Sequence, residues 1–167
     1  SIPIKDHVGI GRIEQMDQES ARMDSYRKVE LDNLIAQYQQ GENTILGKEY
    51  EETGINLSGG EWQRVILASA YMGEPEILLL DEPSASIDSL KENAMLENLK
   101  NELRGKTAIL ISHRIAFARL ADRIIMMKDG KIAEEGSHEE LLLKKGYYAE
   151  FFEKQKELYW DREEEKT

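Results

Sequence analysis

A serine followed by two glycines gives this chain a segment suited to bind phosphate. Ser58, Gly59 and Gly60 stand at the start of a stretch of helical pattern, and the first backbone N–H groups of a helix have no partner inside the helix. A hydroxyl group and two residues without side chains leave room for an anion there. The same residues would also serve as an ordinary helix cap, so the segment alone does not decide between the two interpretations.

Two adjacent carboxylates, Asp81 and Glu82, follow the apolar run 77–80. The run is bounded by turn residues and predicts a buried strand of a parallel sheet, whose ligands bind at the carboxyl ends of the strands. An aspartate in this place can hold Mg²⁺, and a glutamate beside it can polarise an attacking water molecule. A solvated acidic pair at the end of a strand is the alternative.

A histidine, His113, follows a second apolar run, 107–111. An imidazole at the carboxyl end of a neighbouring strand could reach a phosphate or water molecule held by the two carboxylates. The alternative is a histidine that caps the next helix. His7 and His138 lie in polar segments without partner ligands, and we expect both to be surface residues.

The first part of the chain predicts helices. We expect an irregular segment over 1–19, where Pro3, Gly9 and Gly11 interrupt any period, and then a helix over 19–40 that ends at Gly41. A polar loop over 42–56 follows.

The helix that begins at Ser58 has Glu61 three residues later, which is typical of a helix start. We expect Val65, Ile66 and Ala70 to form its apolar stripe.

The rest of the chain alternates strands and helices. Strands are predicted over 77–80 and 107–111, with a helix over 89–103 between them and a short helix over 114–120 after them. A hairpin turns at Asp129-Gly130, and two further helices cover 137–144 and 147–160. This order predicts an α/β layer with a parallel sheet.

Composition excludes several classes of protein. The 167 residues carry a net charge of -11, which argues against a nucleic-acid partner. The absence of cysteine excludes disulfides and thiolate zinc sites. The longest apolar runs are too short to cross a bilayer. The chain begins with Ser1 instead of methionine, which we interpret as a fragment boundary.

The order of these motifs resembles that of the ATP-binding cassette (ABC) ATPases. Residues 57–64, Leu-Ser-Gly-Gly-Glu-Trp-Gln-Arg, resemble the signature motif of that family, and 77–82 resemble its Walker B strand with the catalytic glutamate. Residues 84–88 resemble the D-loop, and Ser112-His113-Arg114 resembles the switch-histidine loop. The resemblance is dense over 57–150, and the set of motifs is highly specific.

The resemblance implies a role for each matching residue near the hydrolysed phosphate. Asp81 would bind Mg²⁺ through its water shell, Glu82 would act as general base, and His113 would contact the γ-phosphate. The implied cofactors are ATP and Mg²⁺ in a complete dimeric domain.

The resemblance also implies contacts across a head-to-tail dimer. Ser58, Gly59 and Gly60 would contact the ATP held by the opposite subunit, and Ser86 and Asp88 of the D-loop would link the two sites. The implied partners are a second nucleotide-binding domain and transmembrane domains on the cytoplasmic side of the cell membrane, without direct insertion of this segment into the membrane. Self-association of the isolated chain is a further expectation.

No Walker A motif, Gly-x-x-x-x-Gly-Lys-Ser/Thr, occurs in this sequence. The resemblance is therefore to the carboxyl-terminal portion of an exporter-type domain, without the Walker A, adenine-stacking and Q-loop regions. It implies an α/β fold, a partial P-loop NTPase core with a mostly parallel sheet plus an α-helical subdomain. We expect the helical subdomain over 1–75, the second half of the ATPase core with the last helices over 76–160, and a disordered tail over 161–167.

Two other functions stay open at this point. The carboxyl-terminal lobe of a chromosome-maintenance or DNA-repair ATPase head also carries signature and Walker B motifs, but it predicts a heptad-patterned coiled coil that 1–56 lacks. A non-catalytic interaction fragment is the other alternative. On the leading hypothesis, the parent protein is an ATPase that energises transport, and the isolated chain is inactive.

Overall fold

The computed structural model describes residues 2–47, 54–83 and 89–164, and the chain forms two compact units, Ser1–Ile109 and Leu110–Thr167. The two units meet at Ile109 and Leu110. The boundary of the helical subdomain after residue 75 stays a prediction. Among the helices of the described residues, none combines the length and the apolar character needed to span a bilayer.

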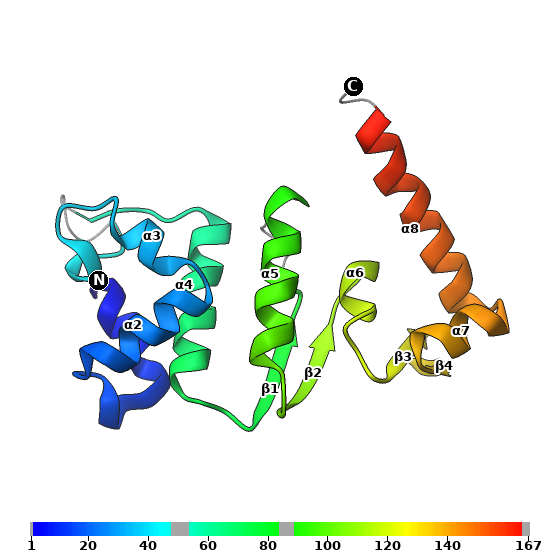
Figure 1. Ribbon diagram of the computed structural model, residues 1–167, viewed down its shortest axis with the longest axis horizontal. Coiled ribbons are helices and arrows are strands. Elements are labelled where there is room, and N and C mark those ends of the chain that lie inside the picture. The colour runs from blue at the N-terminus through cyan, green and yellow to red at the C-terminus, as the bar shows by residue number, and fades with distance from the viewer. Residues whose placement is uncertain (1, 48–53, 84–88, 165–167) are drawn as a thin grey trace. The chain divides into compact units, whose positions relative to one another are not determined.

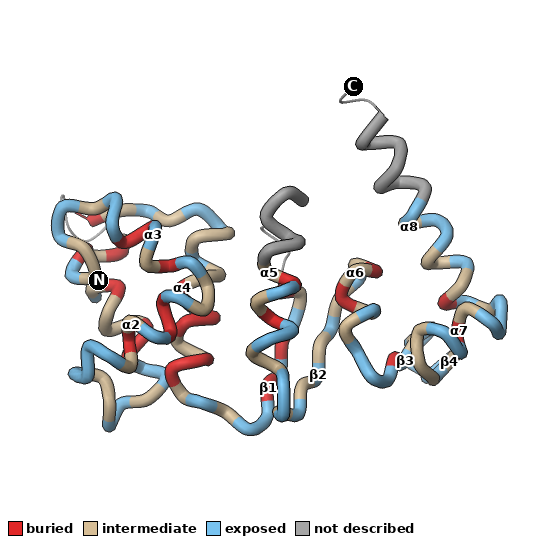
Figure 2. The backbone as a smooth tube through the Cα atoms, in the orientation of Figure 1, coloured by how far each residue is buried: buried red, intermediate tan, exposed pale blue. Residues whose placement is uncertain are grey.

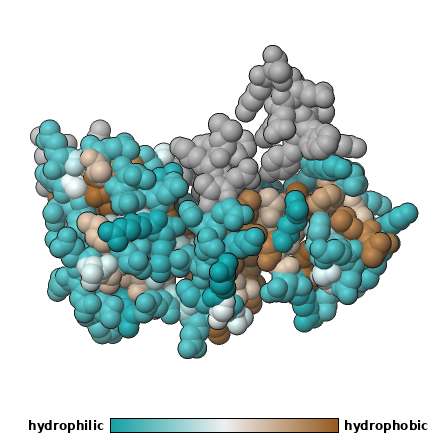
Figure 3. Space-filling view, viewed as in Figure 1, coloured by the Kyte–Doolittle hydropathy of each residue, from teal (hydrophilic) through white to brown (hydrophobic). Residues whose placement is uncertain are grey.

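The first unit begins with a group of helices (Figure 1). They are the α-helices α1, α2, α3 and α4 and the 3₁₀ helices η1 and η2, with the bounds α1 Ile4–Gly9, η1 Ile10–Gln15, α2 Glu19–Lys28, α3 Leu31–Ile35, η2 Gly41–Asn43 and α4 Gly59–Met72. Figure 2 shows buried residues in this group of helices, and the face drawn in Figure 3 is mostly hydrophilic over them. The helical subdomain therefore has its own core, made of Ile4, Val8, Tyr26, Leu31, Leu34, Ile35, Leu46, Val65, Ala68 and Met72.

The prediction of an irregular segment over 1–19 is wrong, because α1 and η1 lie within it. Pro3 is the N-cap of α1, where its missing N–H group costs nothing because no helical acceptor exists for it. Gly11 lies against the backbone of α4, since a Cβ atom added there would stand 1.8 Å from the carbonyl oxygen of Ser69. Proline and glycine thus allow helix entry and close packing in this segment.

The single helix predicted over 19–40 is also wrong. It divides into α2 and α3 at Glu30, which has a φ of 56° and therefore a left-handed backbone that a helix interior does not allow. Gly41 does not end a helix but begins η2. The buried apolar residues Tyr26, Leu31, Leu34 and Ile35 lie on both sides of this break.

Helix α4 ends at Met72 with Gly73 as its C-cap, and its apolar stripe differs from the prediction. Val65 is buried, whereas Ile66 is 63% exposed. The core face of α4 is instead completed by Leu67, Ala68, Tyr71 and Met72. Burial raises the pKa of Tyr71 to about 12.

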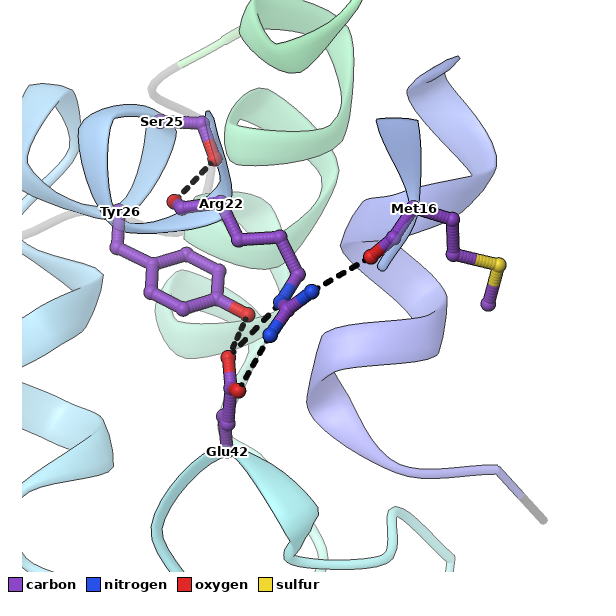
Figure 4. A network of polar contacts seen from close by, with 5 residues as sticks. All are labelled: Met16, Arg22, Ser25, Tyr26 and Glu42. Carbon is purple, nitrogen blue, oxygen red and sulfur yellow. Dashed lines mark hydrogen bonds and ion pairs between the residues drawn. The ribbon is translucent and has the colours of Figure 1, made fainter. Parts of the chain in front are cut away.

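An ion pair between the buried Arg22 and the partly buried Glu42 joins α2 to η2 (Figure 4). The guanidinium of Arg22 donates two hydrogen bonds to the carboxylate of Glu42, from Nε over 3.1 Å and from Nη2 over 2.7 Å, and a third from Nη1 to the carbonyl oxygen of Met16 over 2.6 Å. The hydroxyl of Tyr26 donates to Glu42 over 2.8 Å. The hydrogen bonds from Arg22 hold the pKa of Glu42 below its ordinary value, and burial raises the pKa of Tyr26.

After α4 the first unit continues as a strand, a helix and a strand. β1 (Ile77–Asp81) and β2 (Thr107–Ile111) form a two-stranded sheet, and α5 (Ser89–Glu102) connects them (Figure 1). This is the crossover connection that parallel strands need, so the predicted strand–helix–strand order is confirmed. The last two residues of β2 belong to the second unit.

Buried and exposed side chains alternate along β1, although a continuous apolar run predicts burial on both faces. Leu78 and Leu80 are buried, whereas Ile77 and Leu79 are 63% and 72% exposed. Ile109 of β2 is 57% exposed. One face of this small sheet is thus apolar and uncovered among the described residues, and self-association through it stays a prediction.

A lysine joins α2 to α5 in the first unit. The Nζ atom of Lys28 lies 3.3 Å from a carboxylate oxygen of Asp24 and 3.4 Å from one of Glu102. Both contacts are single N–O approaches, unlike the two-pronged contact of Arg22.

The second unit combines a hairpin with three helices. These elements are α6 (Ile115–Ala118), β3 (Ile124–Lys128), β4 (Lys131–Gly136), α7 (His138–Lys144) and α8 (Tyr147–Glu164). The predicted turn is confirmed, since Asp129 and Gly130 both have positive φ and β3 pairs antiparallel with β4. The core of this unit consists of Ile115, Ile124, Leu141 and Tyr148.

The predicted end of the last helix is wrong, because α8 continues to Glu164 and takes in much of the expected tail. Residues 165–167 lie outside the described residues. The amino end of α8 is fixed by Glu134 of β4, whose carboxylate oxygens accept hydrogen bonds from the N–H groups of Tyr147 and Tyr148, each over 2.8 Å.

Replacing Glu42 with glutamine should destabilise the helical subdomain by about 2–4 kcal/mol, because the charge of Arg22 would be left without its partner in a side chain that is 9% exposed. Since the pKa of Glu42 is lowered in the folded state, its contribution is present above the unfolded pKa and lost as the pH falls through the folded pKa. Urea denaturation of both proteins at neutral and acidic pH measures the difference, which should shrink towards acid.

Glu74→Gln is the matched control. Glu74 pairs with Arg12 over 2.7 Å, but its side chain is 72% exposed, so its loss should change the free energy of unfolding by less than about 0.5 kcal/mol. Equal effects of the two substitutions would contradict a structural role for the buried pair.

Candidate functional site

The start of α4 is a complete capping box. The side-chain oxygen of Ser58 accepts a hydrogen bond from the N–H group of Glu61 over 3.3 Å, and the carboxylate of Glu61 accepts one from the N–H group of Ser58 over 2.7 Å. Gly59 and Gly60 occupy the first two helical positions, whose N–H groups have no acceptor within the helix. The predicted helix start is confirmed, and its phosphate-binding role stays a prediction.

Asp81 and Glu82 lie at the end of β1, as predicted. Asp81 is the last residue of the strand and is exposed. Glu82 is partly buried and has a φ of 44°, a left-handed conformation that costs a non-glycine residue roughly 1–2 kcal/mol. Its carbonyl oxygen accepts a hydrogen bond from Nε2 of Gln63 over 3.3 Å. The peptide group that carries the Glu82 carboxylate is therefore held by a residue of α4.

Gln63 was missed as a site residue by the sequence analysis. It belongs to the motif quoted there, and it lies on α4 five residues after Ser58. The signal that could have found it is a long polar side chain inside an otherwise packed helix, whose Oε1 is buried without a hydrogen-bond partner among the described residues. It connects the two motifs that the sequence singled out.

His113 is exposed and lies two residues after β2 ends. The N-cap of the following helix α6 is Arg114, whose side chain makes no capping hydrogen bond, so the interpretation of His113 as the cap is wrong. The hydroxyl oxygen of Ser112 accepts from the N–H group of Arg114 over 3.1 Å. The carbonyl oxygen of His113 accepts from Nε2 of Gln155 in α8 over 2.5 Å.

The other two histidines are partly buried, which corrects the expectation of surface residues. The ring of His7 meets that of Trp62 edge-on at 5.1 Å between centroids, and burial lowers the pKa of His7. Nδ1 of His138 lies 2.7 Å from the hydroxyl oxygen of Tyr148. Both histidines pack within their own units.

The D-loop residues Ser86 and Asp88 lie outside the described residues. Within the described residues, no group of three or more histidine, aspartate or glutamate side chains is arranged to hold a metal ion. A lone exposed carboxylate such as that of Asp81 fits Mg²⁺, which is usually bound by one or two carboxylates together with substrate phosphates and water.

A comparison with known proteins decides the family. The sequence model of the ABC transporter family matches residues 4–85. A solved structure of a bacterial Atm1-family ABC exporter with ATP bound has a TM-score of 0.80 and 32% identity, over 92% of this chain and 26% of that one. The chain belongs to the ABC transporter family. Its α/β fold is a partial ABC ATPase core with a helical subdomain, as predicted.

Two relatives are similar to this chain over most of its length. The mitochondrial potassium channel ATP-binding subunit of Pongo abelii is 37% identical over 91% of this chain and 20% of its own length. The probable multidrug resistance ABC transporter ATP-binding/permease protein YheI of Bacillus subtilis is 35% identical over 91% of this chain and 25% of its own length. The chain thus spans a fifth to a quarter of these two relatives, and the chromosome-maintenance alternative is not favoured.

The two capping boxes of this ABC chain give a matched pair of substitutions. Ser137 of α7 accepts from the N–H group of Glu140 over 3.2 Å and stands in the same arrangement as Ser58. Ser58→Ala and Ser137→Ala should each reduce the free energy of unfolding by about 1 kcal/mol, because each leaves one helix N–H group unpaired. Urea denaturation measures the two losses, and a Ser58→Ala protein as stable as the wild type would contradict the cap.

Proposed function

We propose that this chain forms the carboxyl-terminal part of the nucleotide-binding domain of an exporter-type ABC transporter. In the complete protein, two such domains would dimerise on ATP, hydrolyse it and drive a substrate across a membrane. The observation that carries the proposal is the conformation of Glu82, a left-handed glutamate at the end of a strand whose carbonyl oxygen is held by Gln63 of the signature helix. Backbone strain of this kind is concentrated at functional sites.

Glu82 acts as the general base of the proposed reaction. Its carboxylate accepts a proton from the water molecule that attacks the γ-phosphate. The hydrogen bond from Gln63 keeps the peptide of Glu82 in its strained conformation, so the position of the carboxylate depends on α4.

Asp81 is the proposed magnesium residue, acting through the water shell of the ion. When bound, Mg²⁺ would neutralise charge that develops on the phosphate oxygens. Asp81 is the last residue of β1, and its exposed carboxylate leaves room for the water molecules between protein and cation. In this proposal Asp81 holds the hydrated cation, and Glu82 accepts the proton of the attacking water molecule.

Ser58, Gly59 and Gly60 contact the ATP of the opposite subunit in this proposal. The Ser58 oxygen uses one acceptor site for the N–H group of Glu61, which leaves its own O–H group to donate to a phosphate oxygen. The N–H groups of Gly59 and Gly60 add two donors at the positive end of the α4 dipole.

His113 contacts the γ-phosphate in the proposed site, and Ser86 and Asp88 link the two sites of the dimer. The partners are a second nucleotide-binding domain and transmembrane domains, with this chain on the cytoplasmic side of the cell membrane. The net charge of -11 argues against a nucleic-acid partner.

Glu82→Gln tests the proposal in the complete transporter. We expect ATP hydrolysis to fall by about 10²–10⁴-fold, because an amide cannot accept the proton of the attacking water. ATP binding should persist, since glutamine keeps the shape of the side chain. Phosphate release under saturating ATP measures the first effect and equilibrium nucleotide binding the second.

Glu76→Gln is the control for Glu82, because Glu76 is exposed and directly precedes the opposite end of β1. It should hydrolyse ATP at the wild-type rate. If Glu82→Gln hydrolysed ATP as fast as Glu76→Gln, Glu82 would not be the general base.

The paired serine variants give a second test of function. Both lose the same capping interaction, so a difference between them in ATP hydrolysis reports phosphate contact and not helix stability. Ser58→Ala should lower kcat/KM at least about tenfold through the lost phosphate contact, and Ser137→Ala should leave it unchanged. Equal rates in the two variants would speak against the Ser58 assignment.

A further inference from the structure

The segment between β2 and α6 makes a hydrogen bond within itself, from the N–H group of Arg114 to the hydroxyl oxygen of Ser112 over 3.1 Å. It runs from Ser112 through His113 to Arg114, and the helix that follows has only four residues and no side chain capping its start. An uncapped short helix leaves its first N–H groups in need of acceptors. The carbonyl oxygen of His113 and the N–H group of Ile115 both have hydrogen-bond partners outside this segment.

Gln155 of α8 supplies two such contacts. Its Nε2 atom donates to the carbonyl oxygen of His113 over 2.5 Å, and its Oε1 atom accepts from the N–H group of Ile115 over 3.0 Å. One amide side chain thus uses both of its ends to hold backbone groups on the two sides of Arg114. Two hydrogen bonds from a planar amide fix both the place and the direction of this peptide segment.

Helix α8 is itself well placed to act as a support. The carboxylate of Glu134 holds its first N–H groups, and Gly146 gives that carboxylate room, because a Cβ atom at Gly146 would stand 1.8 Å from it. Tyr148 is fully buried in the core of the second unit, together with Ile115 at the start of α6. Gln155 lies seven residues after Tyr148, two helical turns along the same face.

We propose that Gln155 is a positioning residue for His113. It acts on the backbone and not on the nucleotide, and it makes the geometry of the switch-histidine loop depend on α8. This inference rests on the proposed function, since it assigns to Gln155 the placement of a histidine that contacts the γ-phosphate. The reaction should therefore lose rate, and not nucleotide affinity, when Gln155 is changed.

Gln155→Met and Gln155→Glu test the proposal in the complete transporter. Methionine keeps the length of the side chain and removes both hydrogen bonds, whereas glutamate keeps the acceptor for Ile115 and removes the donor to His113. We expect kcat to fall roughly ten- to a hundredfold in both variants, with KM for ATP within about twofold of the wild type, because a small displacement of a reacting group slows the chemical step. Deuterium exchange in the peptide 112–118 should become faster in Gln155→Met.

Lys154→Met is the control, because Lys154 is exposed on the same helix. It should keep the wild-type kcat and exchange rate. His113→Ala tests the proposed function separately from the role of Gln155. If this variant hydrolysed ATP at the wild-type rate, the proposed role of His113 would be contradicted. A fully active Gln155→Met beside an inactive His113→Ala would overturn only the inference, and so would a loss of kcat matched by an equal loss in Lys154→Met.

Discussion

The helical subdomain depends on one buried charge pair. Arg22 and Glu42 are twenty positions apart in sequence, and their two-pronged contact fixes α2 against η2 while the third hydrogen bond of Arg22 reaches the carbonyl oxygen of Met16. The guanidinium of Arg22 thus connects α2, η2 and the turn at Met16. The apolar core around Tyr26 and Leu31 packs beside this pair, and α4 packs on that core. Since α4 carries Ser58 and Gln63, the placement of the candidate site rests on the pair as well.

In the second unit, side chains of one carboxylate and one amide residue hold backbone groups of neighbouring elements. Its helices α6 and α7 are short, and side chains hold backbone groups where regular hydrogen bonds end. Glu134 does this at the start of α8, and Gln155 does it at the start of α6. The contacts of Glu134 join residues 13 and 14 positions apart, and that of Gln155 with Ile115 joins residues 40 positions apart. The candidate reactive residues stand on such connections instead of in the interior of long helices.

The sequence predicted most reliably what local chemistry determines. The helix start at Ser58, the Asp129-Gly130 turn and the strands that end near Asp81 and His113 all follow from a few adjacent residues. The break at Glu30 was not predictable, because nothing local favours a left-handed glutamate and the packing of α2 and α3 imposes it. Helices α1 and η1 were missed because glycine usually interrupts helices. At Gly11 it instead allows close packing against α4, which the sequence alone does not show. Gln63 and Gln155 are ordinary polar residues until their distant partners are in place.

Lys28 and Arg22 each connect α2 to another element, but their charged groups differ in geometry. A guanidinium that grips a carboxylate with two parallel bonds permits one orientation, whereas an ammonium group presents three equivalent donors and no preferred plane. The contact of Lys28 with Glu102 therefore tolerates more than one angle between α2 and α5, whereas the contact of Arg22 with Glu42 favours one orientation of α2 and η2. The ion pair between α2 and η2 is thus the more directional of the two contacts, and the one between α2 and α5 the less directional.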